Sequence, residues 1–265
     1  VPTFTPTLTP TLSASATPTP TASGTATPTP TPSPTAAFPI WMWGANSTGQ
    51  FGIGTTAAGL PAQVVRYYPE WTAYSAASNG FSAWLRFDGT LWLAGSNGAG
   101  QLCQGDTTNR SSLVQELSGS TWNYLGSSAA STVYAVKASD NLLYAAGGND
   151  FGMLGINSSG SRFSMVPVAS NVTDWKQVVG SDGNTYALRN NGDAWGWGNN
   201  NVGQLNSASA APAVSSPIQI VNDKSFASIQ SGSDNFVGLV DTGAGYTLWT
   251  CGYNAYGQQG TGNEV

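Results

Sequence analysis

From residue 40 onward, apolar and polar residues alternate in short runs that are separated by Gly, Asn and Asp. The segment from Thr185 to Arg189 shows the alternation, and we interpret it as a strand. Pairs such as Asn191-Gly192 accept the positive φ of a two-residue hairpin turn, and Asp88-Gly89 and Asp140-Asn141 have the same character. No stretch keeps a 3.6-residue apolar period over about 12 residues. The pattern therefore predicts an all-β structure for residues 40–265.

One motif, aromatic-x-x-Gly-x-Asn-x-x-Gly, occurs five times, and its asparagines are spaced 51, 52, 51 and 54 residues apart. Glycine allows tight strand exits, and an asparagine side chain can bond the backbone of its own turn. We interpret these positions as a structural repeat motif rather than as ligand-binding residues. They are Gly44, Asn46, Gly49, Gly95, Asn97, Gly100, Gly147, Asn149, Gly152, Gly198, Asn200, Gly203, Gly252, Asn254 and Gly257.

A second set of aromatic residues recurs at the same spacing, at Trp71, Trp122, Trp175 and Phe226. Each unit reads as four short strands, and a four-stranded meander repeated about every 51 residues fits a β-propeller blade. The pattern predicts complete blades at 71–117, 122–169 and 175–221, three strands at 225–252, and strands three and four of another blade at 38–66. The predicted fold is thus an incomplete β-propeller, and we expect the native polypeptide to continue past Val265.

Residues 1–39 differ sharply from the rest, with 10 of the 15 prolines and no charged side chain. We expect an extended Thr/Pro-rich anchor or stalk at 1–39, followed by a propeller domain at 40–265. In an extended chain, Phe4, Leu8 and Leu12 share one face. These three residues are therefore predicted to dock on a partner chain, with partner-strand hydrogen bonds to the threonine edge.

The composition of the chain excludes several kinds of functional site. The chain has no histidine, which removes Ser-His-Asp and Cys-His nucleophiles and histidine metal ligands. Only 8% of residues are charged and the net charge is −5, which argues against a nucleic-acid surface. No apolar run is long enough to span a membrane. The acidic residues are scattered among the predicted turns. Cys103 and Cys251 are predicted to be buried thiols in separate blades. We therefore predict no catalytic, metal or cofactor site, and no enzymatic activity.

Nine of the ten tryptophans lie at positions that recur from one repeat unit to the next, and we expect them to belong to the hydrophobic core. Trp84 is the exception, because the aligned residues are Ala135, Ala187 and Gly238. It is predicted to be a local large-for-small core replacement, with a binding role as the alternative.

The segments beginning Trp43-Gly-Ala-Asn and Trp197-Gly-Asn-Asn resemble the repeats of the regulator of chromosome condensation family. The resemblance covers roughly residues 38–265 and implies the seven-bladed propeller of that family. The histidine usual near the start of strand two is absent here, where Phe81, Thr132, Asn184 and Asn235 align. The exchange activity of the founding member is not implied, because no motif matches its contact residues.

Together these features favour a non-enzymatic extracellular structural or binding protein. The divergent repeats look similar to propeller modules of tailed-bacteriophage virions, which suggests a fibre or decoration component in an extracellular or virion location. Its partners would be other protein chains, in a homo-oligomer or a virion, with a host-surface receptor or glycan as a further possibility. The alternatives are a secreted bacterial adhesin or protein inhibitor and, third, an intracellular exchange factor or scaffold.

Overall fold

The computed structural model describes residues 40–57, 59–63, 71–126, 131–206 and 211–262. Within these ranges every regular element is a β-strand, and the strands form five antiparallel sheets. The all-β fold predicted from the alternating pattern is confirmed. The Thr/Pro-rich tract, with Phe4, Leu8 and Leu12, lies outside the described residues, so the predicted anchor stays a prediction.

Three of the sheets are complete four-stranded meanders, which we call blades I, II and III. Blade I contains β3 (Trp71–Ala77), β4 (Phe81–Arg86), β5 (Leu91–Gly95) and β6 (Arg110–Gln115). Blade II contains β7 (Trp122–Leu125), β8 (Thr132–Lys137), β9 (Leu143–Gly147) and β10 (Arg162–Pro167). Blade III contains β11 (Trp175–Gly180), β12 (Asn184–Arg189), β13 (Ala194–Asn199) and β14 (Ala213–Val221). Each pairs its strands in chain order.

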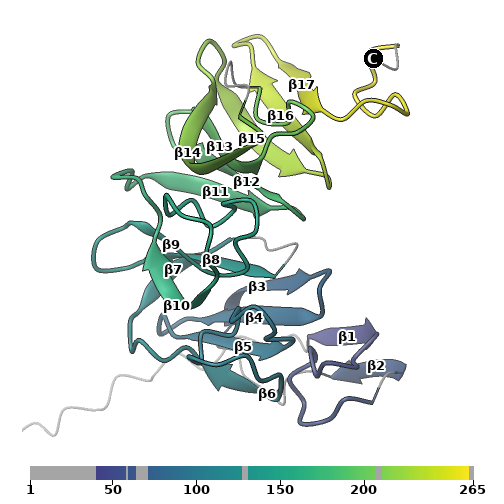
Figure 1. The fold of residues 1–265 in the computed structure, drawn as a ribbon, viewed down its shortest axis with the longest axis vertical. Coiled ribbons are helices and arrows are strands. Elements are labelled where there is room, and N and C mark those ends of the chain that lie inside the picture. Colours follow the sequence, from purple (N-terminus) through teal and green to yellow (C-terminus); the bar gives the residue numbers. More distant parts are fainter. Residues whose placement is uncertain (1–39, 58, 64–70, 127–130, 207–210, 263–265) are drawn as a thin grey trace, which may run out of the picture. The chain divides into compact units, whose positions relative to one another are not determined.

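Two smaller sheets flank the complete blades. β1 (Trp41–Gly44) pairs with β2 (Gly59–Gln63), and these are strands three and four of a blade by their place in the repeat. β15 (Phe226–Ser231), β16 (Asn235–Asp241) and β17 (Tyr246–Gly252) form a three-stranded sheet, which we call the terminal sheet. Figure 1 shows the sheets stacked in chain order, and the blade limits agree with those expected from the repeat.

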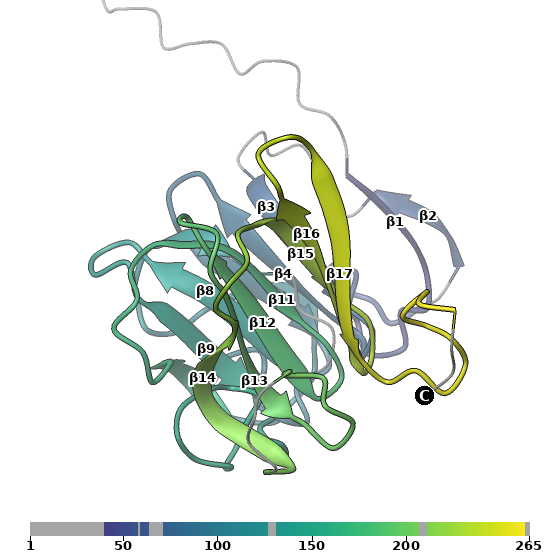
Figure 2. The same ribbon diagram turned by 90° about the horizontal axis from the view of Figure 1, so that it is seen from above.

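Each blade buries its faces against its neighbours rather than by itself. Phe81, Leu85 and Leu93 of blade I pack against Trp122 and Val133 of blade II. The next seam joins blades II and III, and a third joins blade III to the terminal sheet, which lies over it in Figure 2. The core is therefore a series of inter-sheet layers, as expected for stacked blades that cannot fold alone.

An aromatic ring on strand one recurs at the start of each seam. Trp122, Trp175 and Phe226 each meet the aromatic residue on strand three of their own sheet, edge to face, with ring centroids 5.6–6.2 Å apart. The rings reach each other because the strand-two residue between them is Ala135, Ala187 or Gly238. At Gly238 a Cβ atom would collide with the Phe226 ring.

Trp84 occupies that strand-two position in blade I and is 1% exposed. Its ring meets Trp71 at 5.8 Å and packs with Trp92, Ile40 and Met42, so it fills the seam between blade I and β1. Its indole Nε1 donates to Ser82 Oγ at 2.9 Å. The structure thus supports the core-replacement interpretation, with a bulky residue facing a sheet of only two described strands.

We expect Trp84→Ala to lower the free energy of unfolding by about 3–5 kcal/mol, because a large buried ring is removed and its neighbours cannot close the space. Chemical denaturation followed by tryptophan fluorescence measures the loss. Phe87→Ala is the control, since Phe87 lies in the same blade but is 66% exposed. Equal, small effects of the two substitutions would contradict the assignment of Trp84 to the core.

Candidate functional site

The meander brings two kinds of loop to the same end of every blade. In four antiparallel strands, the turn between strands one and two and the loop between strands three and four lie at one end, while the turn between strands two and three lies at the other. We call the first end the loop face. In the described residues it contains the Gly-x-Asn-x-x-Gly loops and the turns at 77–81 and 180–184. The turn at 86–91 lies at the opposite end.

The motif asparagine holds its own loop in shape. In blade II, Asn149 Oδ1 accepts a hydrogen bond from Leu154 N at 2.9 Å, and its Nδ2 donates to the carbonyls of Ser158 and Gly160 at 2.7 and 3.1 Å. Equivalent bonds to the asparagine oxygen come from the backbone of Phe51, Leu102, Leu205 and Gln259. The buried amides are therefore engaged by their own loops.

The second motif glycine brings its loop against the next blade. At Gly152, φ is +76° and an added Cβ would lie 2.7 Å from the Cα atom of Ser215 on β14. Nearby, Asn157 N donates to the Ser215 carbonyl at 2.7 Å. The same pair of contacts joins Gly49 and Gly54 to Ser111, and Gly100 and Gly105 to Phe163. We call this repeated contact the loop-strand joint.

A backbone carbonyl in the blade II loop adds a buried polar contact at the seam. The Met153 carbonyl accepts hydrogen bonds from Tyr134 Oη at 2.9 Å, Thr185 Oγ1 at 2.8 Å and Trp197 Nε1 at 2.7 Å. Two of the three donors belong to blade III. Burial raises the pKa of Tyr134 to about 12 and keeps its hydroxyl protonated.

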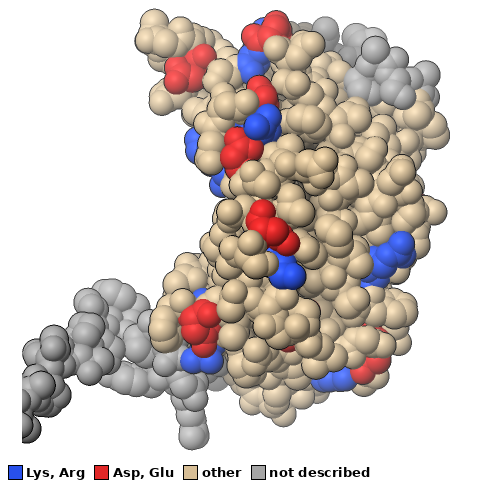
Figure 3. All heavy atoms as spheres, turned by 90° about the vertical axis from the view of Figure 1, so that its left-hand side faces the viewer, with Lys and Arg blue, Asp and Glu red and all other residues tan. Residues whose placement is uncertain are grey.

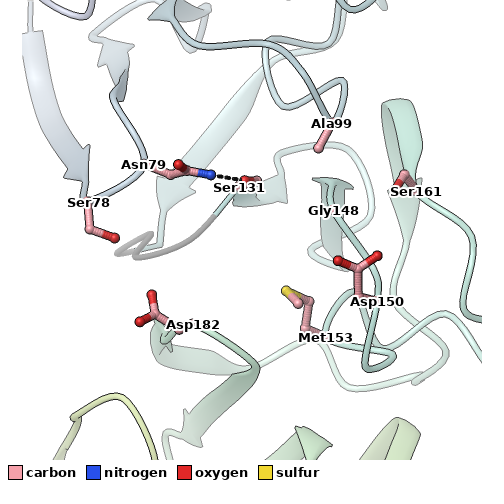
Figure 4. Close-up of a pocket in the computed structure, with 9 residues that line it drawn as sticks. All are labelled: Ser78, Asn79, Ala99, Ser131, Gly148, Asp150, Met153, Ser161 and Asp182. Atoms are coloured by element: carbon pink, nitrogen blue, oxygen red, sulfur yellow. Dashed lines mark hydrogen bonds between the residues drawn. The ribbon is translucent and has the colours of Figure 1, made fainter.

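A polar pocket of about 370 Å³ opens on the loop face where the three complete blades meet. Its carboxylates are Asp150 of blade II and Asp182 of the first turn of blade III, both on exposed residues. Figure 4 shows the Met153 side chain beside Asp150, and Ser78 across from Asp182. The remaining lining residues are Asn79, Ala99, Ser131, Gly148 and Ser161, and Asn79 Nδ2 donates to Ser131 Oγ.

Within the ranges that the structure describes, the two carboxylates of this pocket lack the basic neighbour that five other aspartates have. Figure 3 shows sparse charged side chains with several acids beside a base on the face in view. Aspartates in such ion pairs are Asp88, Asp106, Asp174, Asp193 and Asp223. Among the described residues, Asp150 and Asp182 have no ion-pair partner. Of these two, only Asp182 has a side-chain hydrogen bond to a described residue, from Ser233 Oγ at 3.2 Å.

The two cysteines lie apart from this pocket as free, buried thiols. Burial raises the pKa of Cys251 to about 12 and raises that of Cys103 well above its ordinary value. Thiolates are therefore scarce at neutral pH. In the described ranges no group of three or more His, Cys, Asp or Glu side chains is arranged to hold a metal ion. No helix among those residues is long and apolar enough to cross a bilayer.

The sequence repeat placed the motif residues in loops, but it did not reveal the pocket. Its lining comes from three blades and includes the first-turn residues Ser78, Asn79 and Asp182, which belong to none of the repeat motifs. One signal was present. Met153 replaces the glutamine found at this motif position in the other four repeats, and the pocket lies at this departure.

We expect Gly152→Ala to destabilise the protein by about 1–3 kcal/mol more than Gly203→Ala, because only the former forces a side chain into a packed strand. Both glycines have positive φ, but a Cβ at Gly203 would meet nothing within 4 Å. Urea denaturation of the two variants measures the difference. Equal losses would mean that the joint tolerates a methyl group.

Tyr134→Phe is expected to cost about 1 kcal/mol at neutral pH, because it removes the hydroxyl's buried hydrogen bonds. In the native protein Tyr134 keeps its proton until about pH 12, whereas unfolded tyrosine loses it near pH 10. The raised pKa therefore stabilises the fold fully below pH 10, and this contribution is lost as pH rises through 12. The stability difference between the native protein and the variant should shrink over that window in denaturation curves. A constant difference would contradict this.

Comparison with known proteins agrees with the geometry. Residues 175–204 match the Regulator of chromosome condensation (RCC1) repeat. Prp20p from Saccharomyces cerevisiae is similar in structure, with a TM-score of 0.68, 18% sequence identity, and coverage of 84% of this chain and 55% of that one. Human WBSCR16 has a TM-score of 0.67 at 18% identity, over 81% of this chain and 56% of that one.

Yeast RCC1 (Prp20) bound to Kap60 matches with a TM-score of 0.64 and 17% identity, over 81% of this chain and 52% of that chain. The chain thus spans about half the length of the solved structures it resembles. At such identities the likeness establishes the fold. The expected similarity to bacteriophage virion and bacterial surface modules is not shown by these comparisons.

The extracellular or virion location expected from the sequence is contradicted, because the similar solved structures are intracellular RCC1-like proteins. The expectation rested on a low-charge, Asn/Ser-rich surface and a Thr/Pro tract. Neither feature depends on a compartment, since uncharged polar loops are equally well solvated inside a cell. Residues 175–204 thus match the regulator of chromosome condensation repeat, and they lie within an array of four-stranded blades that shares the RCC1 propeller fold.

Proposed function

We propose that this chain is a non-catalytic, intracellular protein-interaction module that binds its partner on the loop face. The observation that carries the proposal is the polar pocket to which three blades contribute side chains. Loops held on a rigid scaffold are a common place for binding residues. A surface that combines several blades can recognise a larger partner than one blade could.

The chemistry of the pocket suits binding better than catalysis. It contains carboxylates, hydroxyls, an amide and a thioether, and it lacks a histidine or cysteine that could serve as a nucleophile or proton shuttle. The two carboxylates lie on exposed residues, where they can meet a partner without loss of the fold. Absence of enzymatic activity remains part of the proposal.

The solved structures with this fold offer a parallel. Prp20p is described with its binding properties to Gsp1p and histones, and yeast RCC1 (Prp20) was solved bound to Kap60. These partners are proteins. We carry over only that class of partner and not their identity, since this chain matches about half of each structure. An intracellular scaffold, the third of the roles considered from the sequence, is therefore favoured over a surface adhesin.

Site-specific photo-crosslinking tests the proposal. A benzoylphenylalanine at Asn79 lies on the pocket rim, whereas one at Phe87 lies at the opposite end of blade I and is also exposed. We expect a protein partner to crosslink at position 79 and not at position 87, in extracts of the source cells. The crosslink should weaken when Ser161→Arg fills the far side of the pocket. Crosslinking at position 87 alone would place the interaction elsewhere and refute the loop-face assignment.

A further inference from the structure

We propose that the pocket binds a cationic side chain, lysine or arginine, projecting from an exposed segment of the partner. This inference rests on the proposed function and specifies the chemistry of its partner. It is based on a cavity that two carboxylates face from different blades, with no basic side chain among the described residues that line it.

The two carboxylates of the lining favour a positively charged ligand. Arg110 lies 2.6 Å from Asp106, and Arg189 lies 2.8 Å from Asp174, so basic residues elsewhere offset neighbouring acids. Asp150 and Asp182 face the cavity from different blades and have no such partner in the described part of the chain. A cation placed between them would be attracted by both, and more strongly than at a flat, fully solvated surface.

The basic residue nearest in sequence to the lining does not fill this role. Arg162 follows the lining residue Ser161, but its guanidinium donates to the carbonyls of Gly160 and Ser161 at 2.8 and 3.1 Å and to Ser158 Oγ at 3.0 Å. Arg162 therefore binds its own loop. The carboxylates in the pocket remain available to an incoming side chain.

The rest of the lining suits the long stem and the donors of such a side chain. Met153 and Ala99 offer apolar contact to methylene groups, which lysine and arginine bury while their charged ends stay at polar groups. Ser78 and Ser161 add hydroxyl acceptors, and a guanidinium or ammonium group has only donors to match them. The volume of about 370 Å³ accommodates one such side chain with water.

A second hollow of about 250 Å³ adjoins the pocket and shares Ser78 and Asp182 with it. Its other lining includes Ser181, Ser231 and Ser233, so it carries no base either. Asp182 thus lines both hollows. An extended partner segment can place its cation in the first pocket and its neighbouring backbone over the serine-rich second one.

Fluorescence anisotropy with labelled hexa-arginine and hexa-lysine tests the inference, with a neutral Gly-Ser hexapeptide as the reference probe. The double variant Asp150→Asn/Asp182→Asn is compared with Asp223→Asn/Asp241→Asn, which changes the net charge equally at other exposed aspartates. We expect the pocket variant to bind a cationic peptide about tenfold more weakly, and the control variant less than twofold, at low ionic strength. Comparison of the two probes shows whether arginine or lysine is preferred.

Equal weakening by the two double variants would mean that the peptides respond only to net charge, and it would overturn the inference. Unchanged binding by the pocket variant would also overturn it. Circular dichroism confirms that both variants fold, as expected for substitutions of exposed side chains that retain an Oδ1 acceptor. A partner that crosslinks at Asn79 but binds the pocket variant normally would leave the proposed function standing while removing the cationic ligand.

Discussion

The array depends on the close approach between a glycine loop of one blade and the fourth strand of the next. Each blade is apolar on both faces and is stable only when its neighbours cover them. The missing side chain at Gly49, Gly100 and Gly152 lets the loop reach the neighbouring backbone, and an N–H a few residues later donates to the same strand residue. Burial supplies the driving force, while this joint fixes where the loop of one blade meets the fourth strand of the next, at the three seams that have it.

The pocket is a consequence of that arrangement. Because the joints hold the loops of blades I and II against the following blades, the first turns and motif loops meet on one face. Side chains that are isolated in sequence, such as Asn79, Asp150 and Asp182, then surround one hollow. The buried carbonyl of Met153, which accepts bonds from two blade III side chains, anchors the loop that carries the pocket's apolar wall.

Much of the fold could be predicted from the spacing of the repeated residues along the sequence. The spacing of the motif and of the aromatic residues on strand one predicted the limits of the blades. Trp84 was recognised as unusual because the other units have a small residue at its position. The pocket could not be predicted from the sequence, because its residues come from three repeat units. Within its own unit, each of them is an ordinary loop or turn residue. The joint was equally hidden, since its acceptor is the main-chain carbonyl of Ser111, Phe163 or Ser215, three positions with different side chains.

That the loop-strand joint is formed largely from main-chain atoms bears on how such arrays change in length. Duplication or deletion of one whole unit of about 51 residues would recreate the same glycine-to-strand contact at the new boundary, whatever residue occupied the acceptor position. The joint at the new boundary would therefore require no particular side chain on the acceptor strand. The side chains on the loop face could then diverge independently, so that a single scaffold acquires different recognition surfaces by unequal recombination followed by point substitution.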